Sequence, residues 1–329
     1  MRKTICCLLL VLLLFPSCHK GLGRESPLLI LSYADNQPED HPATKAAYYF
    51  ASLVEEKTDG KVLIEVYADG ELGKEDSVYE QMRYGGIDIS RVSLGILTDH
   101  INELTVLILP FIYRDSEHMW KVLDGEAGDY FLSLTGGGSP VGMAWFDAGA
   151  RSFYTREQVS SLADLEGLKI RVLETDLMER FFEPLGVVPV RMAYGDIYSS
   201  LVKGSIDGAE NNMPSYYSMG HYQAARFVYM DEHCRLPELL MISADARDKL
   251  ENLSPRLYPV ILEAAEETAL YERKLWKEAE EESLRKAVEA GCVITYPSKQ
   301  DRDAARELMT AVYDEYNIYS DLLRRIAAE

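Results

Sequence analysis

The sequence predicts an α/β protein of two similar lobes, joined by hinge strands and braced by one long helix. Strands and helices alternate along 28–91 and again along 168–203, a pattern typical of sheets covered by helices. No Ser/Gly-rich linker separates the two halves, so we expect several extended segments to connect them rather than one flexible tether. A single helical pattern then occupies most of 255–290.

In the first half, alternation and apolar runs predict strands, and spacings of three and four predict helices. The expected elements are strands at 28–33, 61–67, 87–91, 105–109 and 142–146, and helices at 43–57 and 75–84. Turn pairs such as Asp59-Gly60 separate them.

The second half repeats this construction. We expect strands at 168–172 and 187–191, helices at 176–184 and 195–203, and a turn-rich segment at 204–212. One lobe would then comprise 26–148 with about 236–275, and the other 149–235 with about 276–329.

The helical pattern near the C-terminus is unusually long. Apolar residues recur at three and four from Pro255 to about Ala290, while the other face is mostly Glu, Lys and Arg. Such a helix would span roughly 50 Å at 1.5 Å per residue. A coiled coil is the alternative, but the heptad is not strict, so we favour a brace packed across both lobes. A helix near 300–316 and a short amphipathic tail close the chain.

The N-terminal segment has the features of a secretory signal. Arg2 and Lys3 precede an apolar run at 5–15, much shorter than the roughly twenty residues that a membrane-spanning helix requires. Cys18 follows the tripeptide FPS, which resembles a bacterial lipobox and predicts a signal peptide at 1–17 with lipidation of Cys18. The alternative is ordinary cleavage of the signal peptide near this position, without lipidation. Both interpretations place the protein in the periplasm or elsewhere outside the cytoplasm, with the lipid as its only link to a membrane.

The composition limits the kinds of partner and ligand that the protein can have. A net charge of −20 argues against nucleic acid as a partner. An acidic protein that binds an anion must build a local positive site, and arginines in the interior would provide one. Of the five cysteines, Cys234 and Cys292 fall outside 1–18, and we expect both to be small buried residues rather than a disulfide framework.

Motifs for catalysis, metals and cofactors are missing. The sequence has no GxSxG, HExxH, phosphate loop or CxxC, and none of its six histidines pairs with a cysteine or another histidine at metal spacing. We therefore expect no enzymatic activity, no cofactor and no metal.

Two arginines and a pair of asparagines say more about function than these missing motifs. Arg171 lies in the expected strand at 168–172, opposite its apolar residues, and a covered sheet would require a partner for it. Arg151 ends the crossing between the halves, and a guanidinium matches a carboxylate with two parallel hydrogen bonds. Asn211 and Asn212 follow a turn, and their amides can both donate and accept. From the residues alone, surface arginines and ordinary turn asparagines remain open alternatives.

Most of the chain, from 28 to about 296, resembles the substrate-binding proteins of tripartite ATP-independent periplasmic (TRAP) transporters. The matching segments are VYADGELGKEDSVYEQMRYGGIDIS at 66–90, LPFIYRDSEHMWKVLDGEAG at 109–128, DLEGLKIRV at 164–172 and MAYGDIYSSLVKGSIDGAEN at 192–211. The resemblance implies a two-lobed, type II-like periplasmic-binding-protein fold with mixed sheets. It also implies that an organic acid is captured between the lobes and delivered to a membrane permease. We expect a monomer.

The resemblance also implies ligand-binding residues. The arginine of the family's KIR strand, which clamps the ligand's carboxylate, falls on Arg171, and a second family arginine falls on Arg151. The asparagine of the DGxEN turn falls on Asn211, the aromatic wall on Tyr194, and a first-lobe contact on Glu75. Looser matching adds Asn36, Ser93 and His233, and Asn212, which replaces a common proline, is a further candidate.

The combination GAENN, PSYY, DEH and PE within 208–238 resembles the branch that binds sugar acids, particularly uronates such as D-glucuronate or D-galacturonate. Uronates carry one carboxylate and a ring of hydroxyls, which extra Asn, Glu and Tyr groups would pair. Sialic acid and C4-dicarboxylates use the same clamp and remain alternatives. Two other classes compete: an enzyme acting on sugar acids, and a sensor or scaffold lipoprotein that binds a partner instead of a solute.

Overall fold

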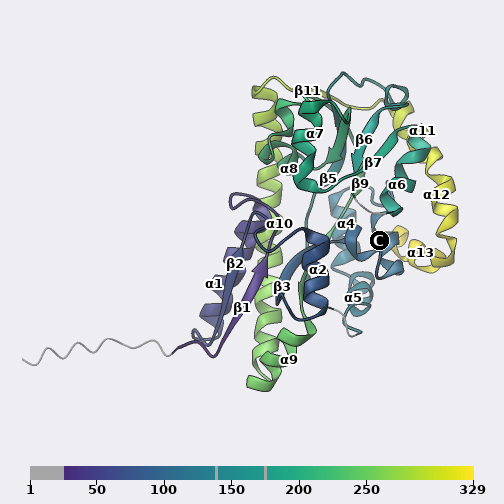
Figure 1. Ribbon diagram of the computed structural model, residues 1–329. Coiled ribbons are helices and arrows are strands. Elements are labelled where there is room, and N and C mark those ends of the chain that lie inside the picture. The colour runs from purple at the N-terminus through teal and green to yellow at the C-terminus, as the bar shows by residue number, and fades with distance from the viewer. Residues whose placement is uncertain (1–25, 138–139, 174–175) are drawn as a thin grey trace, which may run out of the picture.

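Two mixed β-sheets form the cores of two lobes in the computed structural model, which describes residues 26–137, 140–173 and 176–329 (Figure 1). The sheet of lobe I has the order β2 (Val62–Tyr67), β1 (Leu29–Ala34), β3 (Ile89–Ser93), β10 (Glu238–Ile242) and β4 (Val141–Phe146). The sheet of lobe II has the order β11 (Val293–Thr295), β9 (Phe227–Arg235), β5 (Ala150–Thr155), β8 (Gly208–Asn211), β6 (Lys169–Val172) and β7 (Val188–Arg191).

Parallel pairs in both sheets arise where helices connect neighbouring strands. In lobe I, β1 is parallel to β2 and β3, and the chain passes between them through α1 (Pro42–Lys57) and α2 (Glu75–Arg83). In lobe II, β6 is parallel to β7 and β8, with α6 (Asp176–Phe182) and α7 (Ile197–Lys203) as connections. β10 and β5 instead pair antiparallel with both of their neighbours, because the chain enters each of them from the other lobe.

Two extended crossings and one helix join the lobes. β4 ends in lobe I and β5 begins in lobe II four residues later, while β9 and β10 make the return crossing through Leu236 and Pro237. After α9 (Ala244–Leu253), α10 (Leu257–Glu289) runs along both lobes (Figure 1). It packs on α1 and β4 of lobe I and on α8 (Met213–Ser218) of lobe II, so the predicted brace is confirmed.

The C-terminal helices connect the lobes a second time, on the side away from α10 (Figure 1). They are α11 (Lys299–Leu308), α12 (Thr310–Glu315) and α13 (Ser320–Ala328). At the lobe II end, Asp301 of α11 accepts a hydrogen bond of 3.3 Å from the Leu162 backbone N–H. At the lobe I end, Nε2 of His118 in α4 (Ser116–Leu123) lies 2.8 Å from the carbonyl oxygen of Ile326, and α13 packs on α5 (Glu126–Ser133).

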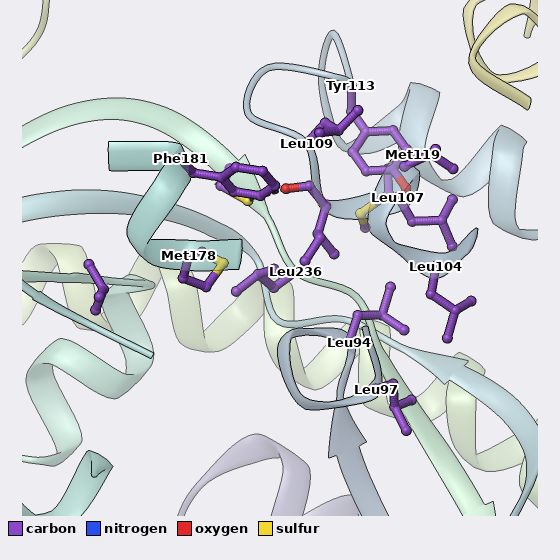
Figure 2. Close-up of a cluster of buried hydrophobic side chains, with 14 of the residues drawn as sticks. Leu94, Leu97, Leu104, Leu107, Leu109, Tyr113, Met119, Met178, Phe181 and Leu236 are labelled. Carbon is purple, nitrogen blue, oxygen red and sulfur yellow. Dashed lines mark hydrogen bonds between the residues drawn. The ribbon is translucent and has the colours of Figure 1, made fainter. Parts of the chain in front are cut away.

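One hydrophobic cluster extends between the lobes (Figure 2). Lobe I contributes residues such as Leu94 of α3 (Leu94–Leu97), and lobe II contributes Met178 and Phe181 of α6. Leu236, from the crossing between β9 and β10, lies between these two groups (Figure 2). Because buried side chains pack densely, this cluster couples the lobes where the chain crosses.

The expected strand at 105–109 is wrong. Asn102–Ile108 is a 3-10 helix in which Leu104 through Ile108 are all buried. A short, continuously apolar run has no period that separates a strand from other buried backbone. The segment 204–212, expected to be turns, contains β8.

The structure bears to different degrees on the expectations about the cysteines, the N-terminal segment and the lobe boundaries. Cys234 and Cys292 are buried free thiols, as predicted. The predicted signal peptide at 1–17 and the lipidated Cys18 lie outside the described residues. The residue boundaries given for the two lobes remain predictions. In the described part of the chain, no helix is long and apolar enough to cross a bilayer.

Candidate functional site

A cleft of about 690 Å³ lies between the lobes. Lobe I lines it with residues that include Asn36, Glu75 and Ile96, and lobe II with residues that include Arg171 and Tyr194. Its volume is typical of small-molecule sites, which occur preferentially between lobes or domains.

Arg171 is the buried cation of this cleft. It lies on β6, inside the lobe II sheet, where its backbone pairs with Val190 of β7 and Ala209 of β8. The residue is 1% exposed, and its Nε donates to the Met192 carbonyl oxygen at 2.8 Å. The terminal Nη groups have no hydrogen-bond partner among the described residues. Burial lowers the pKa of Arg171, although the guanidinium stays charged, so the site holds a desolvated positive charge that an anion would stabilise.

Two tyrosines, Tyr154 and Tyr194, lie near this guanidinium. The Tyr194 hydroxyl donates to Oε1 of Gln37 at 3.3 Å and so connects lobe II to lobe I across the cleft. On the inner side, the Tyr154 hydroxyl lies 2.8 Å from Nδ1 of His221. Burial, and then the neighbouring charge of Arg171, lower the pKa of His221 to about 3. The neutral imidazole therefore adds no second positive charge to the site.

Arg151, the second predicted arginine, is already paired within the protein. Its Nε and Nη2 donate to the two carboxylate oxygens of Glu210 at 2.5 and 2.8 Å. Nη2 also donates to the Glu210 carbonyl oxygen at 2.9 Å, and Nη1 donates to Oδ1 of Asn211 at 2.8 Å. Burial alone would raise the pKa of Glu210, but the charge of Arg151 outweighs it and holds the pKa at about 2. The pair therefore stays ionised, and Arg151 has little hydrogen-bonding capacity left for a ligand.

His233 completes this buried network behind the cleft. Its Nδ1 lies 3.0 Å from the Asp231 carboxylate, and its Nε2 lies 3.6 Å from Oε2 of Glu210. Burial would lower the pKa of His233, but the carboxylates of Asp231 and Glu210 outweigh it and raise the pKa to about 9. A protonated His233 supports Glu210, which in turn fixes Arg151.

The lobe I wall of the cleft presents carboxyl and amide side chains. Oε1 of Glu75 accepts a hydrogen bond of 2.5 Å from the Ser93 backbone N–H, and its Oε2 accepts a long bond of 3.4 Å from Nδ2 of Asn36. Burial raises the pKa of Glu75, and the nearby charge of Arg91 partly offsets this. Behind these residues, Arg91 pairs with Asp35 at 2.9 Å.

The predicted ligand residues divide into two groups in the structure. Arg171, Glu75, Tyr194 and Asn36 line the cleft, and the remaining five do not: Ser93, Arg151, Asn211, Asn212 and His233. Ligand binding by all nine remains a prediction.

Local contacts occupy part of the two asparagine side chains. Oδ1 of Asn212 caps α8 by accepting from the Ser215 backbone N–H at 2.8 Å. Oδ1 of Asn211 accepts from Arg151 and from the Asn212 backbone N–H, while its Nδ2 has no partner among the described residues.

Sequence reasoning missed the charged group behind Glu75, which consists of Arg91, Asp35 and Glu238. Arg91 stands in β3 between Ser90 and Val92, so its signal in the sequence is weaker than that of Arg171, which has an apolar residue on each side. Among the described residues, no group of three or more His, Cys, Asp or Glu side chains is arranged to hold a metal ion. The cleft thus combines a buried guanidinium on lobe II with carboxyl and amide groups on lobe I.

A model of the bacterial extracellular solute-binding proteins, family 7 (DctP), matches residues 33–318. The chain belongs to this family. A solute-binding protein of Chromohalobacter salexigens is 38% identical over 280 residues, which are 85% of this chain and 82% of that protein. The TRAP family predicted from the sequence is therefore confirmed, and the protein acts outside the cytoplasm.

Two solved structures of TRAP periplasmic solute-binding proteins match the DctP fold seen here. The protein of Pseudomonas putida F1, solved with D-glucuronate, has a TM-score of 0.87 and 32% identity over 91% of this chain and 97% of its own. The protein of Bradyrhizobium sp. BTAi1, solved with α/β-D-galacturonate, has a TM-score of 0.86 and 36% identity over 91% of this chain and 99% of its own. The predicted two-lobed α/β fold is confirmed.

Proposed function

We propose that this TRAP solute-binding protein captures a uronate, D-glucuronate or D-galacturonate, with the carboxylate of the ligand held by Arg171. The observation that carries the proposal is the 1% exposed guanidinium whose Nη groups have no partner among the described residues, although it lines an interlobe cleft. A buried cation without a carboxylate partner is unfavourable, and an acid ligand supplies that partner.

Two further observations support a uronate. Glu75 and Asn36 face the cleft from lobe I with carboxylate and amide groups, which are suitable partners for sugar hydroxyls. The solved relatives from Pseudomonas putida F1 and Bradyrhizobium sp. BTAi1 hold uronates and match this chain over 91% of its length.

The remaining steps of the proposal follow from a receptor of this kind. The lobes close on the ligand by a hinge motion at the crossings between β4 and β5 and between β9 and β10. The closed protein, a monomer tethered through lipid on Cys18, then delivers the acid to the TRAP permease subunits without converting it.

A thermal-shift screen tests the proposal. D-glucuronate or D-galacturonate should raise the melting temperature, with no product after prolonged incubation, whereas succinate and sialic acid should have a smaller effect. Stabilisation by succinate alone would contradict the uronate assignment. No stabilisation by any carboxylate would contradict the receptor function, and product formation would indicate an enzyme.

A further inference from the structure

The two walls of the cleft differ in the charged side chains that line them. On lobe II the buried charge is the guanidinium of Arg171, and the lining also contains one carboxyl side chain, Asp196, which is exposed to solvent. On lobe I the lining contains five carboxyl side chains and two basic ones: Asp69, Glu75, Asp76, Glu80 and Asp99, with Lys74 and His100. Asp69, Asp76 and Asp99 are exposed to solvent, where their charges are screened, so a ligand that reaches across the cleft from Arg171 meets its less exposed carboxyl groups at Glu75 and Glu80.

The buried cation of lobe I does not change this balance. Arg91 is 3% exposed, and its Nη2 donates to Oδ1 of Asp35 at 2.9 Å and to Oδ1 of Asn36 at 2.6 Å. Its Nη1 lies 2.6 Å from Oε1 of Glu238. One guanidinium thus faces the two carboxyls of Asp35 and Glu238, with Glu75 as a third carboxyl nearby. Arg91 is occupied by the protein and is not among the residues that line the cleft.

The amino end of α2 does not attract a second anion either. A helix N-terminus carries a partial positive charge that favours carboxylates. In α2 the first turn already contains Glu75 and Asp76, which complement that charge. The neighbouring basic residue Lys74 is exposed to solvent, where its charge is screened.

Glu75 is the member of this wall placed to select the ligand. Its Oε1 is held by the Ser93 N–H at 2.5 Å, whereas its Oε2 has only the 3.4 Å contact with Asn36. Oε2 can therefore accept a hydrogen bond from a ligand hydroxyl. A second carboxylate has no proton to donate and would place like charges together in a partly desolvated site.

We propose that the lobe I wall restricts this cleft to acids with a single carboxylate, with Glu75 as the specificity-determining residue that accepts a hydroxyl end and rejects a second carboxylate. This inference rests on the proposed function, because Arg171 must hold the first carboxylate. It excludes the six-carbon diacids that carry a carboxylate at both ends. Like charges about 5 Å apart at an effective dielectric constant of about 20 weaken binding on the order of a hundredfold.

The test is calorimetric titration of the full chain at pH 8 with monoacids and diacids of the same carbon skeleton. The monoacids are D-glucuronate, D-galacturonate and D-gluconate, and the diacids are D-glucarate and galactarate. The wild type should bind the tightest monoacid about a hundredfold more tightly than either diacid. In Glu75→Gln this ratio should fall at least tenfold, because the amide oxygen can still accept from Ser93 while the negative charge is gone.

Matched variants isolate the effect of charge at this position. Glu117→Gln neutralises a side chain that is 80% exposed and outside the cleft lining, so it should change the ratio less than threefold. If Glu75→Gln fails to fold, Asp69→Asn is the second variant. Asp69 lines the same wall at φ 53°, a conformation that asparagine tolerates, and its substitution should lower the ratio about threefold.

The outcomes separate this inference from the proposed function. A diacid that binds the wild type within threefold of the best monoacid would overturn the inference and leave the receptor function standing. A ratio unchanged in Glu75→Gln, or diacids still undetectable with that variant, would overturn the role of Glu75. If no monoacid binds the wild type, the proposed function and the inference both fail.

Discussion

Replacing Arg171 by methionine should separate the protein's binding function from its stability. Arg171→Met keeps an unbranched side chain in a position that is 1% exposed but removes the guanidinium. If this group pairs with the ligand's carboxylate, its loss leaves a buried anion without its partner. Removing one member of such a pair costs about 2–5 kcal/mol. The dissociation constant for D-glucuronate should therefore rise at least about thirtyfold.

The ligand-free protein should respond in the opposite direction. Without ligand, the guanidinium has one hydrogen bond, from Nε to the Met192 carbonyl oxygen, and its Nη groups have no partner among the described residues. Replacing a buried charge by an apolar side chain of similar volume is often neutral or stabilising. We therefore expect the free energy of unfolding of ligand-free Arg171→Met to equal or exceed that of the wild type.

Calorimetric titration with D-glucuronate and urea unfolding without ligand measure the two effects. Arg285→Met is the control, since this arginine of α10 pairs with Glu282 at 2.6 Å and neither residue lines the cleft. Its affinity should stay within twofold of the wild type. Binding by Arg171→Met within threefold of the wild type would refute the clamp. A loss of affinity that merely follows a loss of folding would refute the stability argument.

Three further predictions concern residues near the cleft and the crossings. The pKa of His233 is about 9 in the folded protein, against 6.5 ordinarily, so its protonation stabilises the fold fully below pH 6.5. The free energy of unfolding should then decline by about 3 kcal/mol as the pH rises through 9. Urea unfolding at several pH values should show this decline, and His233→Gln should lack it. Tyr194→Phe removes the 3.3 Å bond to Gln37 across the cleft and should weaken ligand binding about two- to tenfold by calorimetry. Gly149→Ala should lower the unfolding free energy by about 1–3 kcal/mol, because a Cβ at φ 63° would lie 2.1 Å from Oε1 of Glu280; an unchanged urea midpoint would contradict this.

The sequence was most informative where a local pattern matched the physics of a single element. Alternation at 168–172 placed Arg171 in a strand, and its charge among apolar neighbours indicated an interior cation. The long helical pattern likewise predicted α10 to within a few residues at each end. Both inferences need only nearby residues.

The features that sequence reasoning missed depend on contacts between distant residues. Arg91 pairs with Asp35, 56 positions away in the sequence, and with Glu238 on the neighbouring strand β10, which the chain reaches only after it has passed through lobe II. Because acidic residues are abundant, the sequence does not indicate which of them are the partners. The engagement of Arg151 by Glu210 is equally long-range, so the sequence suggested a ligand contact where the structure shows an internal ion pair. β9 was missed because Asp231, Glu232 and His233 interrupt its apolar pattern, and one partner of His233, Glu210, lies on the distant strand β8.

A crystal structure with D-glucuronate bound is the most direct test of the central claim. The account predicts the ligand's carboxylate within about 2.7–2.9 Å of the Nη atoms of Arg171, with its hydroxyls directed toward Glu75. A structure in which the carboxylate lies against lobe I, or in which Arg171 contacts no part of the ligand, would contradict it.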